Sequence, residues 1–200
     1  MSGKFIVFEG VDGAGKTTQM KLLHKKLTTI GHDCIMTYEP GDNSVGVSVR
    51  KFLIEKDLDA VSEALLFAFD RAVHIREVVR PAIDEGKIVL CDRFLMSSLV
   101  YQGIARGLGE EWINEINSKG LGGLVPDVTL VFDIAVDMAL KRVQNANRFE
   151  NTSLQEKVRE GFIKKSGETP NTFLIEAGRS EEEVFLSVWE KVSWLLKEEK

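Results

Sequence analysis

One run of eight residues has the side chains and glycines of a phosphate-binding loop. Residues 10–17 read Gly-Val-Asp-Gly-Ala-Gly-Lys-Thr, which matches G-x-x-x-x-G-K-[ST] at every fixed position. The glycines let successive backbone N–H groups point at one anion. Lys16 brings a positive charge to the β- and γ-phosphates, and the Thr17 hydroxyl can join a Mg²⁺ shell. A random chain of this length carries the motif with odds on the order of one in a hundred, so we interpret it as an ATP or GTP phosphate site.

Two other predicted strands end in an aspartate that could hold Mg²⁺. Asp92 closes the run Ile-Val-Leu-Cys, and Asp133 closes the run Thr-Leu-Val-Phe. We favour Asp92 as the metal residue, directly or through water, and interpret Asp133 as a cap of the segment that follows it. Arg93 comes directly after Asp92 and so lies at the carboxyl end of a central strand, where α/β proteins bind their ligands. Its guanidinium could clamp a second phosphate.

A third group of residues lies within Leu-Leu-Phe-Ala-Phe-Asp-Arg at 65–71. Phe67 and Arg71 are four residues apart and therefore face the same side of a predicted helix. A ring that stacks on a nucleobase, beside a guanidinium that donates to its edge, would recognise a base, although this spacing alone more often marks a core aromatic. We expect Phe69 to lie in the core and His74 to be a core or surface histidine.

The elements that must position these side chains alternate along the chain. Short β-rich runs predict strands at Lys4–Glu9, Asp33–Glu39, Lys87–Asp92, Val128–Asp133 and Thr172–Glu176. Helical patterns lie at Gly15–Ile30, at Val61–Asp84 and behind a capping box of Ser180 and Glu183. Alternating strands and helices indicate a parallel sheet, and near-continuous apolar strands indicate burial on both faces. The sequence predicts one α/β domain over residues 1–200, a doubly wound five-stranded parallel sheet with helices on both faces.

The composition restricts the partners and the location. With 44% hydrophobic residues the chain is not disordered, and its net charge of −5 lacks the basic balance of a duplex-DNA binder. Cys34 and Cys91 lie in apolar runs, which predicts buried reduced thiols rather than a disulfide. No segment reads as a signal peptide or a membrane span. We expect a cytoplasmic protein with neither a nucleic-acid nor a membrane partner.

Four segments, in this order and spacing, resemble the bacterial-type thymidylate kinases along nearly the whole chain. The first is the phosphate loop with its flanks, Phe-Glu-Gly-Val-Asp-Gly-Ala-Gly-Lys-Thr-Thr at 8–18. The others are Glu-Pro-Gly at 39–41, the helical run at 65–71, and Asp-Arg-Phe, Ser-Ser and Tyr-Gln-Gly within 92–103. The loop alone would indicate only the P-loop superfamily, and the N-K-x-D tetrad of GTP switches does not occur in the chain.

The resemblance implies a P-loop NTPase fold, transfer of the γ-phosphoryl group of ATP to dTMP with Mg²⁺, and a homodimer. It implies ATP-binding roles for Gly10, Val11, Asp12, Gly13, Ala14, Gly15, Lys16, Thr17, Thr18 and Arg142. It implies dTMP-binding roles for Asp12, Glu39, Pro40, Leu53, Phe67, Arg71, Arg93, Ser98, Tyr101 and Gln102.

Particular roles within the acceptor set also follow from the resemblance. Phe67 would stack on thymine, Arg71 would donate to a base carbonyl, and Arg93 would hold the 5′-phosphate. Tyr101 would pack under the sugar where a ribose 2′-hydroxyl would fall, which favours the deoxy form. Ser98 and Gln102 would contact the edge of the base.

Residues 141–153 resemble the family's lid, which closes over the phosphates. Members with glycine at the position of Gly13 usually bring a lid arginine to the transferring phosphoryl group, where charge develops in the transition state. Arg148 matches the lid pattern best, and Arg142 is the alternative. The residues then implied in catalysis are Lys16, Arg148, Arg93 and Asp12, with Thr17 and Asp92 for the metal.

The segment around Glu-Pro-Gly departs from the family. Many relatives read Arg-Glu-Pro-Gly-Gly-Thr where this chain has Tyr38, Asp42 and Asn43 around the same tripeptide. The lost arginine and the added carboxylate leave open how strictly dTMP is preferred over dUMP or other monophosphates. The alternatives are a P-loop kinase of another nucleotide or nucleoside, and an ATP-binding regulator without phosphotransfer. The acceptor-side residues argue against the regulator.

Overall fold

The computed structural model describes residues 3–142 and 152–196, which form a parallel sheet with helices on both faces. The strands are β1 Lys4–Gly10, β2 Cys34–Tyr38, β3 Ile88–Asp92, β4 Val128–Asp133 and β5 Thr172–Glu176. Each lies within one residue of its predicted bounds at either end. The predicted fold class is therefore confirmed. The three central strands are buried almost throughout, as their continuous apolar runs require.

The strand order is β2-β3-β1-β4-β5, with every neighbouring pair parallel. The chain leaves β1 to build one side of the sheet and then returns to build the other. Reversals of this kind place ligands beyond the carboxyl ends of the central strands. The ends of β1 and β3 are direct neighbours, since Phe8 pairs with Asp92.

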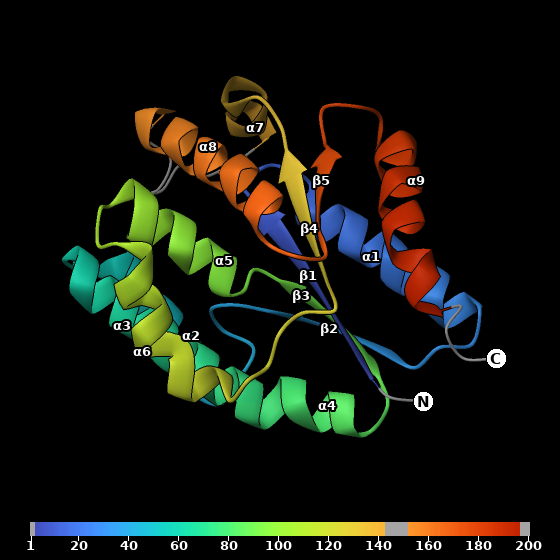
Figure 1. Ribbon diagram of the computed structural model, residues 1–200, viewed down its shortest axis with the longest axis horizontal. Coiled ribbons are helices and arrows are strands. Elements are labelled where there is room, and N and C mark those ends of the chain that lie inside the picture. Colours follow the sequence, from blue (N-terminus) through green and yellow to red (C-terminus); the bar gives the residue numbers. More distant parts are fainter. Residues whose placement is uncertain (1–2, 143–151, 197–200) are drawn as a thin grey trace.

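The helices fall on the two faces of this sheet (Figure 1). Their bounds are α1 Lys16–Thr29, α2 Gly46–Glu55, α3 Ala60–His74, α4 Arg80–Asp84, α5 Leu95–Ser98, α6 Glu110–Leu121, α7 Val136–Arg142, α8 Thr152–Glu168 and α9 Glu181–Val192. Helices α1 and α9 pack together on one face, while α4, α5 and α8 contact the sheet from the other. The capping box predicted at Ser180 and Glu183 begins α9.

Two helical stretches contain π-helical turns that the sequence pattern did not predict. The region predicted as one helix runs through α3, a π-helical turn at Ile75–Val79 and α4. A second π-helical segment, Leu99–Ala105, continues α5. Such wider turns often occur at functional sites because they change the direction of the side chains they carry.

The burial of single residues agrees with the sequence in most places and differs in one. Cys34 and Cys91 are buried free thiols, as expected, and His74 is a fully buried core histidine. The expectation that Phe69 lies in the core is wrong, because half of its surface is exposed. The apolar pattern of α3 continues around to its outer side, so periodicity alone did not distinguish the two sides. Within the described residues, no helix has the length and apolar character to cross a membrane.

Candidate active site

The phosphate loop connects the buried end of β1 to the start of α1. Gly13 and Gly15 both have left-handed backbones, with φ of 79° and 90°. A Cβ at Gly13 would lie 2.2 Å from the carbonyl oxygen of Ala139, so this position has no room for any side chain. A positive charge for a bound phosphoryl group therefore has to come from a residue other than 13.

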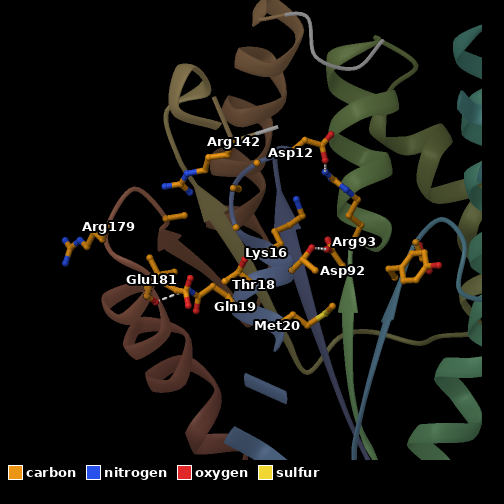
Figure 2. Close-up of a pocket in the computed structure, with 18 of the residues that line it drawn as sticks. Asp12, Lys16, Thr18, Gln19, Met20, Asp92, Arg93, Arg142, Arg179 and Glu181 are labelled. Carbon is orange, nitrogen blue, oxygen red and sulfur yellow. Dashed lines mark hydrogen bonds and ion pairs between the residues drawn. The ribbon is translucent and has the colours of Figure 1, made fainter. Parts of the chain in front are cut away.

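The Lys16 ammonium lies at the base of a cavity of about 920 Å³ (Figure 2). Its Nζ donates to the carbonyl oxygens of Gly10 and Val11, at 3.1 and 2.9 Å. Burial, reinforced by the nearby positive charge of Arg93, lowers the pKa of Lys16 to about 8. An incoming phosphate would supply the negative charge that restores its affinity for the proton.

Most of the predicted ATP-binding residues line this cavity, namely Asp12, Gly13, Ala14, Gly15, Lys16, Thr17, Thr18 and Arg142. Gly10 and Val11 lie beneath it and contribute the carbonyl groups that hold Lys16. Arg179 and Glu181 lie on the side of the cavity away from Arg93 (Figure 2). Ala177, directly after β5, and Val184, in the first turns of α9, also line the cavity. Arg148 lies outside the described residues, so its place is not part of this geometry.

The two predicted metal residues are in direct contact. The Thr17 hydroxyl donates to Asp92 Oδ2 at 2.8 Å, although the two residues are 75 positions apart. Asp133 behaves differently from its sequence interpretation as a cap. Both of its oxygens accept from Arg159 of α8, at 2.6 and 3.0 Å, and so join the sheet to that helix.

Arg93 follows directly after β3 and has a left-handed backbone conformation, with φ of 70°. Its Nη2 donates to Asp12 Oδ1 at 2.7 Å, and its Nη1 donates to Ser97 Oγ at 3.1 Å. The guanidinium also lies 5.4 Å from the ring centre of Tyr101. The positive charge of Arg93 holds the pKa of Asp12 below its ordinary value. These contacts hold Arg93 at the edge of the phosphate loop.

A buried carboxylate beneath Arg93 escaped the sequence analysis. Glu9, fully buried at the end of β1, accepts from the backbone N–H groups of Phe94 and Ser97 at 2.9 and 3.1 Å. It also accepts from the Ser97 hydroxyl at 2.5 Å. Burial raises the pKa of Glu9 to about 7 despite these hydrogen bonds. The only sequence signal was an acidic residue within an apolar strand, directly before the phosphate loop.

A second cavity, of about 180 Å³, adjoins the first. All ten residues predicted for dTMP line it: Asp12, Glu39, Pro40, Leu53, Phe67, Arg71, Arg93, Ser98, Tyr101 and Gln102. The two cavities share Asp12, Glu39, Arg50 and Arg93. Arg50, on α2, is a further cation that the sequence analysis missed, because a lone arginine on a predicted helix looks like a surface charge.

Arg71 is almost fully buried in the wall of the smaller cavity. Its Nε donates to Glu39 Oε2 at 2.8 Å, and its Nη1 donates to Asn117 Oδ1 at 2.6 Å. Its Nη2 donates to the Phe94 carbonyl and the Ser98 hydroxyl at 3.1 and 3.0 Å. The remaining oxygen of Glu39 contacts His74 Nδ1 at 3.0 Å. His74 thus supports the carboxylate that orients Arg71 and does not itself line the cavity.

This architecture defines a class of protein. The structure contains the parts of a P-loop phosphotransferase. These are a phosphate loop after β1, an arginine directly after β3, and two adjoining cavities whose shared wall contains arginines and carboxylates. In such a protein a nucleoside triphosphate and a phosphorylated acceptor meet at the shared residues.

Comparisons with known proteins identify the family within this class. The sequence model of the thymidylate kinase family matches residues 8–188. The chain is 46% identical to the thymidylate kinase of Thermoanaerobacter sp. (strain X514), over 90% of this chain and 92% of that protein. It is 42% identical to the thymidylate kinase of Pelotomaculum thermopropionicum, over 94% and 92% of the two chains. The crystal structure of thymidylate kinase from Ehrlichia chaffeensis superposes with a TM-score of 0.80 at 32% identity, covering 95% of this chain and 98% of that one.

The chain therefore belongs to the thymidylate kinase family. It is accordingly a phosphotransferase of the dTMP kinase type with ATP as its phosphate donor.

Proposed function

We propose that ATP occupies the larger cavity and dTMP the smaller one, with their phosphates meeting between Lys16, Asp12 and Arg93. The observation that carries this assignment is the shared wall of the two cavities, where Asp12 and Arg93 form an ion pair of 2.7 Å. The larger cavity contains the phosphate loop, and the smaller one contains an aromatic ring and buried hydrogen-bonding groups that suit a base.

In the proposed reaction an oxygen of the acceptor phosphate attacks the γ-phosphorus, and the bond from that phosphorus to the β-phosphate oxygen breaks. The acceptor is already an anion, so alignment and charge neutralisation matter more than a protein base. Arg93 would hold the acceptor phosphate in line. Lys16 would neutralise charge on the donor, and Asp12 would orient Arg93 through their ion pair.

A lid cation would complete the charge at the transferring group. Arg142 lines the donor cavity from α7, and the closed backbone at Gly13 supports a source outside the phosphate loop. Arg148, which the sequence predicts for the same role, is the other candidate. Either arginine would place positive charge where the phosphoryl oxygens gain negative charge.

Thr17 and Asp92 suit Mg²⁺ because a hydroxyl and a carboxylate are hard oxygen ligands. Thr17 Oγ1 and Asp92 Oδ2 already lie 2.8 Å apart. Mg²⁺ normally keeps several waters and binds through few protein oxygens and the substrate phosphates. Thr17 would bind it directly and Asp92 through water. The ion would neutralise charge on the donor phosphates.

In the smaller cavity Phe67 would stack on thymine, and Ser98, Arg71 and Gln102 would contact its edge. Leu53 and Pro40 would form the apolar wall. Tyr101, buried beside Arg93, would pack under the sugar. Its burial raises the pKa of the phenol above its ordinary value, so the ring remains neutral in this position.

We further propose a homodimer and a cytoplasmic location. Val61, Leu65 and Phe69 recur at intervals of four on α3 and are 43 to 50% exposed. An exposed apolar stripe along one helix supports a helix-packed interface with a second copy. The free thiols of Cys34 and Cys91 support a reducing compartment.

Replacement of Arg93 by alanine tests the central assignment. Charge-assisted hydrogen bonds contribute about 1.5–3 kcal/mol each, so we expect Arg93→Ala to raise the KM for dTMP by about ten- to a hundredfold. The KM for ATP should stay within about threefold. Arg80→Ala serves as the control, because that guanidinium contacts Gly122 and lines neither cavity. An unchanged KM for dTMP in Arg93→Ala would contradict the assignment.

A further inference from the structure

A buried carboxylate behind the smaller cavity lies between a carboxamide and a guanidinium. Glu63, in the first turn of α3, is fully buried, although acidic side chains seldom are. Its Oε1 accepts from Gln102 Nε2 at 2.7 Å. Its Oε2 lies 3.3 Å from Nη2 of Arg106, whose side chain is 26% exposed. Glu63 does not line the cavity, so its effect on a ligand would pass through Gln102.

This contact determines which end of the Gln102 amide faces Glu63. A carboxylate paired with a guanidinium only accepts hydrogen bonds, whereas an amide has one accepting and one donating end. The NH₂ end of Gln102 must therefore point to Glu63, and the carbonyl oxygen Oε1 points away from it. Because Gln102 is 2% exposed and lines the cavity, the end that it offers to a ligand is this acceptor.

Arg71 is fixed in a comparable way and offers the opposite polarity. A guanidinium has five N–H donors, and four are used in contacts with Glu39, Asn117, Phe94 and Ser98. The fifth, on Nη1, belongs to a side chain that lines the same cavity. The wall can thus offer a ligand a donor from Arg71 beside an acceptor from Gln102.

We propose that Glu63 is a positioning residue for base selection, which holds Gln102 so that the site accepts 4-keto pyrimidines and rejects 4-amino pyrimidines. Thymine and uracil present a carbonyl at position 4 and an N–H at position 3, which match the donor and the acceptor. Cytosine presents an amine at position 4 and a bare nitrogen at position 3. To bind cytosine, the Gln102 amide would have to turn its oxygen toward the Glu63 carboxylate, so that two acceptors would face each other and Glu63 Oε1 would lose its buried hydrogen bond. This inference rests on the proposed function, since it requires the base in this cavity.

The isosteric change Glu63→Gln tests the proposal. The new amide can donate or accept, so both orientations of Gln102 become available. We expect the ratio of kcat/KM for dTMP to that for dCMP to fall by about tenfold, equivalent to about 1.4 kcal/mol. Most of this change should come from improved use of dCMP. The ratio of dTMP to dUMP should not change, because those two bases present the same edge.

The exchanged variant Glu63→Gln/Gln102→Glu tests whether the direction of the hydrogen bond between residues 63 and 102 sets selectivity, separately from any loss of folding. It keeps a carboxylate–carboxamide pair and again presents an oxygen acceptor to the cavity, so selectivity for dTMP over dCMP should return. Glu85→Gln is the matched control, since it removes an exposed carboxylate whose partner is Lys87. The KM for ATP and the melting temperature of each variant report on the integrity of the fold.

The outcomes separate this inference from the proposed function. A wild-type enzyme that is selective for dTMP, with Glu63→Gln equally selective, would overturn the role of Glu63 and leave the proposed function standing. An exchanged variant with the reduced selectivity of Glu63→Gln would also overturn it. A wild-type enzyme that uses dTMP and dCMP equally well would refute the assignment of the cavity itself, and the role of Glu63 with it.

Discussion

Replacing Glu9 by glutamine should remove a pH dependence of stability that arises at the base of the active site. The Glu9 carboxyl is fully buried, and burial raises its pKa from an ordinary 4.5 to about 7. The folded protein therefore binds this proton more tightly than the unfolded chain does. Stability from this group is fully present below pH 4.5 and is lost as the pH rises to about 7.

The size of the effect follows from the two pKa values. Each tenfold change in proton affinity is equivalent to about 1.4 kcal/mol, so the free energy of unfolding should fall by about 3 kcal/mol between pH 4.5 and pH 8 because of Glu9. Glutamine carries no titrating proton, and its carbonyl can still accept from the N–H groups of Phe94 and Ser97. Glu9→Gln should therefore gain about 3 kcal/mol relative to the wild type across this interval.

Urea denaturation at a series of pH values measures this difference directly. Subtracting the wild-type free energy of unfolding from that of Glu9→Gln cancels the other titrating groups, provided that the m-values agree. The exposed variant Glu85→Gln controls for the loss of a carboxylate in general. A difference that stays constant from pH 4.5 to pH 8 would show that Glu9 titrates normally, and the argument from burial would then be wrong.

Two further predictions concern the metal and the assembly. Asp92→Asn should raise the Mg²⁺ concentration needed for half-maximal activity by about ten- to a hundredfold, because residues that act on a metal through water typically have effects of that size. An unchanged Mg²⁺ requirement in a Mg²⁺ titration of activity would exclude Asp92 from the metal site. Leu65→Glu should convert the proposed homodimer into monomers, since it places a charge in the apolar stripe on α3. Light scattering after size-exclusion chromatography measures the mass of the assembly, and a variant that remains a dimer would show that the interface does not include this stripe.

The framework of the molecule could be predicted because its signals are local. Strands buried on both faces need continuous apolar runs, and a strand, a glycine-rich turn and a helix start in direct succession specify the phosphate loop. The sequence therefore predicted each strand to within one residue at either end. The two π-helical turns could not be predicted in this way, because the spacing of apolar residues does not distinguish an occasional wider turn from a regular helix.

The residues of the candidate site were less predictable from the sequence than the framework, because their roles depend on contacts between distant parts of the chain. The residues expected around the acceptor line one cavity, but that expectation came from a family resemblance rather than from spacing. Glu9, Arg50 and Glu63 were missed because their roles depend on partners far away in the chain. Glu63, for example, is 39 residues from Gln102. A single acidic residue in a predicted helix looks like a solvated charge until the fold buries it.

The charged residues of the site lie near the adjacent carboxyl ends of β1 and β3. Asp12, in the phosphate loop two residues after β1, and Arg93, directly after β3, are 81 residues apart, and the pairing of β1 with β3 brings them together. Glu9 extends this support by holding the backbone that follows Arg93. Groups held in place before substrates arrive need little reorganisation when charge develops in the transition state. In the proposed catalysis Asp12 and Arg93 are therefore in contact before substrates bind, and a lid arginine, Arg142 or Arg148, would supply the remaining positive charge.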